Sequence, residues 1–464
     1  MVIYIQLLLQ VGFVASIPAA SRDVVGEPTS QWFQVADILN RLRAPLFPTQ
    51  QFVITDFGAV ADGKSDCTAA IRRAIAECHR AGGKVVVPKG EFLTGPIHLQ
   101  SNVELHLDKD ATLKFTTDPK AYLPVVFTRF EGMECYNYSP LIYAFEQENV
   151  AMTGEGTLDG QASDENWWQW KGGKGVPPGS PNQKPARDRL GKMVDENVPV
   201  QQRNFGEACF LRPSFVEFNR CRNVLIEGIS IRRSPMWEIH PLLCTNVAVR
   251  GVNIESHGPN NDGCDPESCH DVLIEDCVFD TGDDCIAIKS GRNNDGRRIG
   301  LASENIIIRH CTMKDGHGGV VIGSEISGGC RNVFAEDCVM DSPNLERVLR
   351  LKSNAVRGGI IENIFMRNIT VGQVKDAVLQ VDFVYEEGPN GLYKPIARNI
   401  VMENIAVEKT PRVLNVVGFQ GAKIEGVRIY DSTFNEVSKT NVVREADVKL
   451  VDCRIKKVYL GPGR

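Results

Sequence analysis

The chain carries a six-residue frame that recurs and holds charged residues. Three copies and a more degenerate fourth occupy residues 285–290, 319–324, 348–353 and 263–268. Each copy ends in serine, and alignment on that serine brings six reactive side chains to one face. They are Asp262, Asp283, Asp284, His317, Arg350 and Lys352. Three acids, a histidine and two cations on one face are suited to catalysis on an acidic substrate.

The same alignment predicts which of these side chains are neighbours. It pairs Asp262 with Asp284 and Asp283 with His317, about 4.8 Å apart if the frames are successive parallel strands. Carboxyls this close cannot all ionise freely, so the pKa of at least one should be raised. A protonated acid beside an ionised base is the equipment for glycoside hydrolysis, and His317 can hold a proton near the acid.

A longer repeat predicts the architecture. An Asn or Asp, alternating aliphatic residues, a turn residue and an apolar residue recur every 22 to 36 residues from Asn223 onward. The copies begin at Asn149, Asn223, Asn246, Asp271, Asn305, Asn332, Asn363, Asn399, Gly421 and Asp447. Short segments rich in Val and Ile and bounded by turn residues indicate strands, and no helical pattern separates them. The sequence therefore predicts an all-β fold, a right-handed single-stranded parallel β-helix.

One position of this repeat accepts cysteine, isoleucine or valine. Cysteine occupies it at Cys277, Cys311, Cys338 and Cys453. A position with this choice of residues belongs in the interior, where free cysteine behaves as a small apolar residue. We therefore expect most of these four thiols to be buried and free of disulfides, although the chain has fourteen cysteines.

The chain divides into three predicted segments. Residues 1–20 resemble a signal peptide, residues 21–50 a linker with a short helix, and residues 51–460 form the β-helix catalytic domain. The amphipathic segment Asp66–His79 is expected to be a helix with an acidic N-cap that closes the N-terminal end of the coil. Residues 160–205 form a long excursion rich in Gly, Pro, Asn and Trp.

The location and the partner class follow from the same features. A signal peptide predicts a secreted or periplasmic protein, and no later segment reaches the ~18–20 apolar residues of a membrane helix. The net charge of −6 lacks the basic footprint of a nucleic-acid binder. We expect a carbohydrate partner, with no nucleic acid and no membrane span.

Four ordered signatures resemble the polygalacturonase family of glycoside hydrolases, which are pectin-cleaving β-helix enzymes. That family carries Asn-x-Asp, Asp-Asp, Gly-His-Gly and Arg-Ile-Lys. Here they read Asn260-Asn-Asp262, Asp283-Asp284, Gly316-His-Gly318 and Arg350-Leu-Lys352. The similarity spans roughly residues 50–455, with Asn261 in place of the usual Thr and Leu351 in place of Ile.

The resemblance implies an inverting hydrolase of α-1,4-galacturonosyl linkages in pectic polysaccharides, with no metal and no cofactor. It implies that Asp283 is the general acid and that His317 supports it. Asp262 and Asp284 would activate the water. The residues implied in substrate binding are Asn260, Arg350 and Lys352.

Two insertions favour exo action over endo action. Residues 292–301, which include three arginines, and the Trp-rich segment 167–170 are long enough to close one end of a binding groove. Two other functions stay open. One is a calcium-dependent pectate lyase, in which the acids would bind Ca²⁺. The other is a non-catalytic glycan-binding β-helix. The Gly-His-Gly signature argues against the first, and the density of acids on one face argues against the second.

Overall fold

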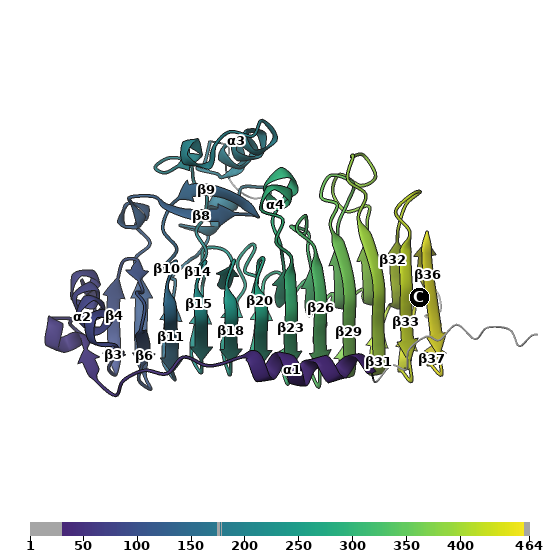
Figure 1. The fold of residues 1–464 in the computed structure, drawn as a ribbon, viewed down its shortest axis with the longest axis horizontal. Coiled ribbons are helices and arrows are strands. Elements are labelled where there is room, and N and C mark those ends of the chain that lie inside the picture. Colours follow the sequence, from purple (N-terminus) through teal and green to yellow (C-terminus); the bar gives the residue numbers. More distant parts are fainter. Residues whose placement is uncertain (1–29, 174–176, 178, 459–464) are drawn as a thin grey trace, which may run out of the picture.

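The body of the protein is a coil of parallel strands (Figure 1). The computed structural model describes residues 30–173, 177 and 179–458. Successive turns of the coil stack their strands into three ladders, and the strand pairings within these ladders are parallel. The parallel β-helix predicted from the repeat is confirmed.

The ladders are as follows. The first contains β1 (Gln51–Val53), β3 (Gly83–Val87), β6 (Val103–Leu107), β11 (Glu148–Gly154), β15 (Arg222–Glu227), β18 (Thr245–Arg250), β20 (His270–Glu275), β23 (Ser303–Arg309), β26 (Cys330–Glu336), β29 (Ile360–Gln373), β31 (Ile396–Thr410), β33 (Ile424–Tyr430) and β36 (Ala446–Val451). The second contains β2 (Asp62–Asp66), β4 (Gly90–Thr94), β7 (Ala111–Phe115), β12 (Thr157–Asp159), β16 (Ser230–Arg232), β19 (Asn253–Ser256), β21 (Val278–Thr281), β24 (Thr312–Met313), β27 (Val339–Met340), the later parts of β29 and β31, β34 (Thr433–Val437) and β37 (Arg454–Lys457). The third contains β5 (Ile97–His98), β10 (Ile142–Phe145), β14 (Val216–Asn219), β17 (Ile239–Leu242), β22 (Ile286–Ile288), β25 (Val320–Ile322), β28 (Arg347–Lys352), β30 (Ala377–Asp382), β32 (Arg412–Val417) and β35 (Val442–Arg444).

The interior of the coil is filled by the repeat positions that the sequence marks as apolar. Cys277, Cys311 and Cys338 are each about 1% exposed and pack among Val, Ile and Met side chains. Cys453 lies on the last described turn and is only partly buried, because no further turn covers it there. All fourteen cysteines lie in the described part of the chain and are free thiols, as expected for interior packing.

The N-terminal end of the coil is covered by α2 (Thr68–Ala81), which confirms the predicted helical cap. Its apolar face buries Ile71 and Ile75 against the first turns of the coil. The expected acidic N-cap differs by one position, because Cys67 is the N-cap residue and offers no side-chain cap. Asp66 instead accepts hydrogen bonds from the amide and the hydroxyl of Thr68.

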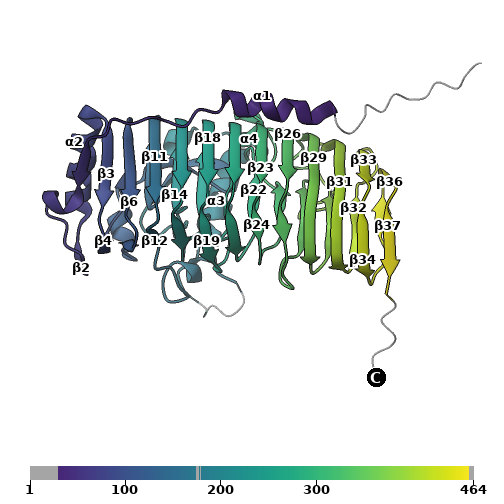
Figure 2. The ribbon, with the colours of Figure 1, turned by 90° about the horizontal axis from the view of Figure 1, so that it is seen from below.

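The segment expected to be a linker holds a helix that packs along the flank of the coil. After a short turn, η1 (Ser30–Trp32), α1 (Phe33–Arg41) runs across the strands (Figures 1 and 2). It buries apolar side chains against Leu273, Ile307, Phe334 and Phe365 of four successive first-ladder strands. Arg41 forms a two-pronged ion pair with Asp271. The predicted signal peptide, 1–20, lies outside the described residues.

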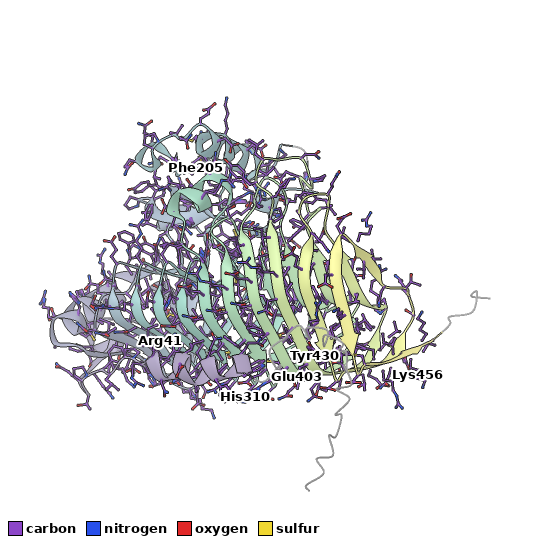
Figure 3. All side chains as sticks on the ribbon, turned by 45° about the vertical axis from the view of Figure 1, so that its right-hand side comes forward. Arg41, Phe205, His310, Glu403, Tyr430 and Lys456 are labelled. Atoms are coloured by element: carbon purple, nitrogen blue, oxygen red, sulfur yellow. The ribbon has the colours of Figure 1, made fainter. Side chains whose placement is uncertain are left out.

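Several insertions form a second layer over part of the third ladder, called here the outer layer. It contains the antiparallel hairpin β8 (Val126–Phe130) and β9 (Met133–Asn137), η4 (Trp168–Lys171), α3 (Lys184–Asp195), η5 (Val200–Gln202), β13 (Asn204–Phe205) and α4 (Asn293–Ile299). Figures 1 and 3 show this layer above the coil, with Phe205 inside it. Two further short helical turns, η2 (Ile54–Phe57) and η3 (Pro119–Tyr122), lie near the N-terminal end.

The outer layer is held to itself by an apolar cluster and by buried ion pairs. Leu190 of α3 and Phe205 belong to the same cluster as Phe130 and Met133 of the hairpin. Residues 292–301, expected to be an added loop at the cleft, form α4 and its flanks and contact α3 and β9. The other insertion that favoured exo action, 167–170, packs Trp167 and Trp170 into the core cluster of the coil and accepts a hydrogen bond at the carbonyl of Trp170 from the amide of Gln183, just before α3, at 2.7 Å. No helix among the described residues is long and apolar enough to cross a membrane.

Candidate active site

The register of the third ladder brings the predicted residues together. The paired positions are Cys264 with Ile286, Ile286 with Val320, and Val321 with Arg350. Asp262 therefore lies level with Asp284, and Asp283 level with His317, as the alignment of the frames predicts. The backbone agrees, because the amide of His317 donates to the carbonyl of Asp283 at 2.9 Å.

Asp283 and His317 form the most exposed part of the candidate site. The Nδ1 atom of His317 lies 2.8 Å from Oδ1 of Asp283, and the two side chains are 47% and 18% exposed. Burial raises the pKa of Asp283, but the hydrogen bond and charge of His317 outweigh it and hold that pKa below its usual range. The same hydrogen bond raises the pKa of His317. The pair therefore holds one shared proton where a substrate can reach it.

Glycine is required on both sides of His317. Gly316 has a φ of +154°, and a Cβ atom there would lie 2.7 Å from the carbonyl oxygen of Asp283. A Cβ atom at Gly318 would lie 2.5 Å from the side chain of Val321. The Gly-His-Gly signature thus lets the strand pass close to the neighbouring rung and present the imidazole to Asp283.

Asp284 is buried and paired with both predicted cations. Its Oδ2 accepts a hydrogen bond from Nζ of Lys352 at 2.7 Å, and its Oδ1 lies 3.6 Å from Nη1 of Arg350. Lys352 is itself only 6% exposed. Its ammonium group therefore contacts Asp284 and is not open to bind a sugar. The ring of Tyr385 lies near both cations, 5.7 Å from Nζ of Lys352 and 5.9 Å from Cζ of Arg350.

The pKa of Asp262 is raised, as predicted for at least one of the three carboxyls. Burial, followed by the negative charge of Asp283, raises this pKa well above its usual range, while Lys289 opposes the change. The Oδ2 atom of Asp262 lies 3.4 Å from Nζ of Lys289, and its Oδ1 has no hydrogen-bond partner among the described residues. Of the two level carboxyls, Asp284 therefore has the closer cation partners.

Asn260 lies against the acid and not in an open binding position. Its Nδ2 is 3.4 Å from Oδ2 of Asp283. Its Oδ1 accepts hydrogen bonds from Nζ of Lys171 at 2.7 Å and from Nη2 of the buried Arg212 at 2.8 Å. Two donors on the carbonyl side orient the amide so that its NH₂ group faces Asp283. The contact of Asn260 with Asp283 helps to fix the position of the Asp283 carboxyl.

Five residues around the site were missed by the sequence analysis as functional groups. They are Lys171, Arg212, Lys289, Glu325 and Tyr385. A signal existed for Lys289, because it occupies the same position in its frame as Lys352. The others lie in insertions or loops, where the repeat gives no register.

Two groups of side chains are spaced closely enough to hold a metal ion. They are Asp283, Asp284 and His317, and His257, Asp280 and Asp315, with ligand atoms within 4.8 Å of one another in each group. In the first group, Asp284 already faces two cationic side chains, which repel a metal cation. In the second, Nζ of Lys314 lies 3.9 Å from Asp280. The first group is better fitted to acid–base chemistry than to calcium binding.

Comparison with known proteins identifies the family. The family model for glycosyl hydrolases family 28 matches residues 198–453, a span that includes every predicted site residue. The chain belongs to glycosyl hydrolases family 28. A second family model, rhamnogalacturonase A/epimerase, pectate lyase-like, matches residues 52–118 of this family 28 chain. A probable polygalacturonase of Vitis vinifera is 30% identical over 399 residues, which cover 81% of this chain and 74% of that protein.

Solved structures agree with this membership. An exopolygalacturonase from Thermotoga maritima is 46% identical, with a TM-score of 0.88, and the match covers 91% of this family 28 chain and 95% of that one. A family 28 exopolygalacturonase from Yersinia enterocolitica has a TM-score of 0.70 at 21% identity, which shows the fold alone. The chain is therefore a glycoside hydrolase with a right-handed parallel β-helix fold, and neither the lyase nor the non-catalytic alternative is favoured.

Proposed function

We propose that this family 28 enzyme is an exo-acting polygalacturonase that releases galacturonate from an end of pectic polygalacturonate, with inversion at the anomeric carbon. The 46% identity to the Thermotoga maritima exopolygalacturonase over 91% of this chain carries the proposal. The three acids, the histidine and the two cations of the third ladder support it, because they match what cleavage of an acidic polysaccharide requires.

In the proposed mechanism, Asp283 takes the proton held on His317 and delivers it to the glycosidic oxygen. It is the most exposed of the three acids, and His317 holds a proton 2.8 Å away that can restore it. As the bond from the anomeric carbon to the leaving oxygen breaks, a water attacks from the opposite face. The proton of that water passes to Asp262 or Asp284. The product therefore carries the inverted anomer.

Arg350 is the better placed of the two cations to bind the sugar carboxylate. Its Nη1 is 3.6 Å from Asp284, which is longer than a hydrogen bond, and its side chain is 12% exposed against 8% for Lys352. Lys352 is engaged at 2.7 Å and chiefly fixes the position of the Asp284 carboxyl. The family resemblance implied that both cations bind the substrate, whereas this geometry supports substrate binding by Arg350 and contact with Asp284 by Lys352.

Exo action predicts a specific product pattern. The outer layer reaches the site, since Lys171 of η4 contacts Asn260, and Arg292 lies 3.2 Å from Glu131 of the hairpin and 3.7 Å from Glu325. An outer layer that closes one end of the binding groove allows only the end of a polygalacturonate chain to bind. We expect monomeric galacturonate from the first minutes while the viscosity of polygalacturonate falls slowly. Chromatography would measure the products, and viscometry would measure the viscosity. A rapid fall in viscosity with mixed oligomers would contradict exo action.

Hydrolysis also predicts independence from divalent metals. Because Lys352 and Arg350 already pair with Asp284 and repel a metal cation there, EDTA should leave the rate unchanged. Products should lack the unsaturated ends, detected by ultraviolet absorbance, that a lyase makes. Loss of activity in EDTA with recovery on addition of calcium, together with rising absorbance, would favour the lyase.

We further propose that the enzyme acts outside the cytoplasm, as a secreted or periplasmic protein, where polymeric pectin is encountered. The proposal is supported by the apolar segment at residues 1–20. The division into a signal peptide, a linker at 21–50 and a catalytic domain at 51–460 belongs to the same proposal.

A further inference from the structure

Lys289 is a buried cation beside the candidate base. It follows β22, is 3% exposed and has its Nζ 3.4 Å from Oδ2 of Asp262 and 3.4 Å from Oε2 of Glu325. The same Nζ lies 4.5 Å from the centre of the Trp237 ring. A lysine is rarely buried unless it is paired, so these contacts define its role.

Lys289 and Lys352 stand in equivalent places. Their frames align on the closing serines, with Gly323 at the position between them. Gly323 has a φ of +95°, and a Cβ atom there would lie 2.2 Å from the carbonyl oxygen of Lys352. Lys352 faces Asp284 and Lys289 faces Asp262. Each of the two carboxyls proposed to receive the proton of the water therefore has its own lysine.

We propose that Lys289 is a positioning residue whose ammonium group, 3.4 Å from Oδ2 of Asp262, favours the ionised form of Asp262 that receives the proton of the attacking water. The inference rests on the proposed hydrolysis and goes beyond it, since the family signatures quoted above do not include Lys289. Lys289 is buried, so it acts on Asp262 without contacting the sugar.

The second anion on Lys289 connects the base to the outer layer. Glu325 lies 3.7 Å from Nη1 of Arg292, and the same nitrogen lies 3.2 Å from Glu131. Glu131 in turn is paired at 2.5 Å with Arg187 of α3. A continuous row of ion pairs thus runs from Asp262 to α3. Glu325 partly offsets the positive charge of Lys289, so its position determines how strongly Lys289 attracts Asp262.

The charges around Asp262 give the expected sign. Burial has the largest influence. The groups that raise its pKa are Asp283, Asp284, Asp265 and Glu238, and those that lower it are Lys289, Lys352 and Arg212. The groups that act on Lys289 are Asp265, Glu325, Asp262 and Asp284, and they raise its pKa despite burial. Lys289 therefore stays charged, and its removal must raise the pKa of Asp262.

The test is the pH dependence of kcat/KM, which reports the groups of the free enzyme. A base must be ionised, so activity falls as the pH falls through its pKa, and a higher pKa moves this acid limb to higher pH. We expect Lys289→Met to move the acid limb up by about 1–3 pH units, the size of effect of a close opposite charge. Lys289→Arg should leave it near the wild-type position.

A second variant gives the opposite sign. Glu325→Gln removes an anion near Asp262 and leaves more of the Lys289 charge to act on it, so the acid limb should move down. This variant keeps the test valid if Lys289→Met does not fold, which circular dichroism would show. The control is Lys449→Met, an exposed lysine of β36, which should shift nothing. A purely structural role would not produce opposite shifts.

The outcomes separate the two proposals. A wild-type enzyme that does not hydrolyse polygalacturonate would overturn the proposed function and this inference with it. Hydrolysis by the wild type, with an acid limb that stays in place or moves in the same direction in both variants, would overturn the role of Lys289 alone.

Discussion

Replacement of Asp283 by asparagine is expected to lower turnover about 10²–10⁴-fold, the usual contribution of a general acid. Asparagine keeps the size of the side chain but cannot give a proton to the leaving oxygen. The proton on His317, 2.8 Å from Oδ1 of Asp283, cannot substitute, because an amide can accept its hydrogen bond but cannot take up that proton and deliver it to the leaving oxygen. The measurement is steady-state kinetics on polygalacturonate, with proton NMR of the first product to identify its anomer.

A matched control lies three residues upstream. Asp280 lies on β21, 3.0 Å from His257, and is not part of the proposed acid–base set. Asp280→Asn should therefore retain near-normal turnover. A near-normal rate in Asp283→Asn, or a product that retains the anomer of the substrate, would contradict the assignment of Asp283 as the acid of an inverting enzyme.

Replacement of Asp295 by alanine is expected to destabilise the protein by about 3–5 kcal/mol, the cost of breaking a buried ion pair. Its Oδ2 accepts hydrogen bonds from Nη1 of Arg203 at 2.6 Å and from the amide of Glu134 at 2.8 Å. The side chains of Arg203 and Asp295 are 3% and 2% exposed. The substitution leaves a buried guanidinium uncompensated and frees α4 from the hairpin. Denaturant and thermal unfolding would measure the effect.

An exposed aspartate in the same layer provides the comparison. Asp188 of α3 pairs with Lys184 across one helical turn, and both side chains are more than half exposed. Exposed pairs contribute ~0–1 kcal/mol, so Asp188→Ala should leave the unfolding midpoint nearly unchanged. Equal effects of the two substitutions would show that Asp295 does not anchor α4. In Asp295→Ala, unfolding of the outer layer before the coil would support the anchoring role.

The fold and the pairing of the acids could be predicted because a β-helix is periodic. Once the closing serines of the frames are aligned, residues at matched positions must stack, and the pairing of Asp262 with Asp284 follows from counting alone. Sequence reasoning could also predict that one carboxyl would have a raised pKa. It could not select Asp262, because the raised pKa of Asp262 depends first on how deeply that carboxyl is buried, which the repeat does not give.

The sequence by itself determined the coil, the interior cysteines and the seven candidate residues, because each of these depends on a local repeat or on the family signatures. Tertiary structure decided the rest. Lys171 reaches Asn260 from the excursion 160–205 and Arg212 from the segment before β14, and neither segment is periodic, so no counting rule places them. The partners of Asp295, Arg203 and Glu134, likewise come from insertions whose packing depends on shape and charge across the outer layer. Side chains that converge from nonperiodic segments are positioned by long-range packing, which a one-dimensional pattern does not encode.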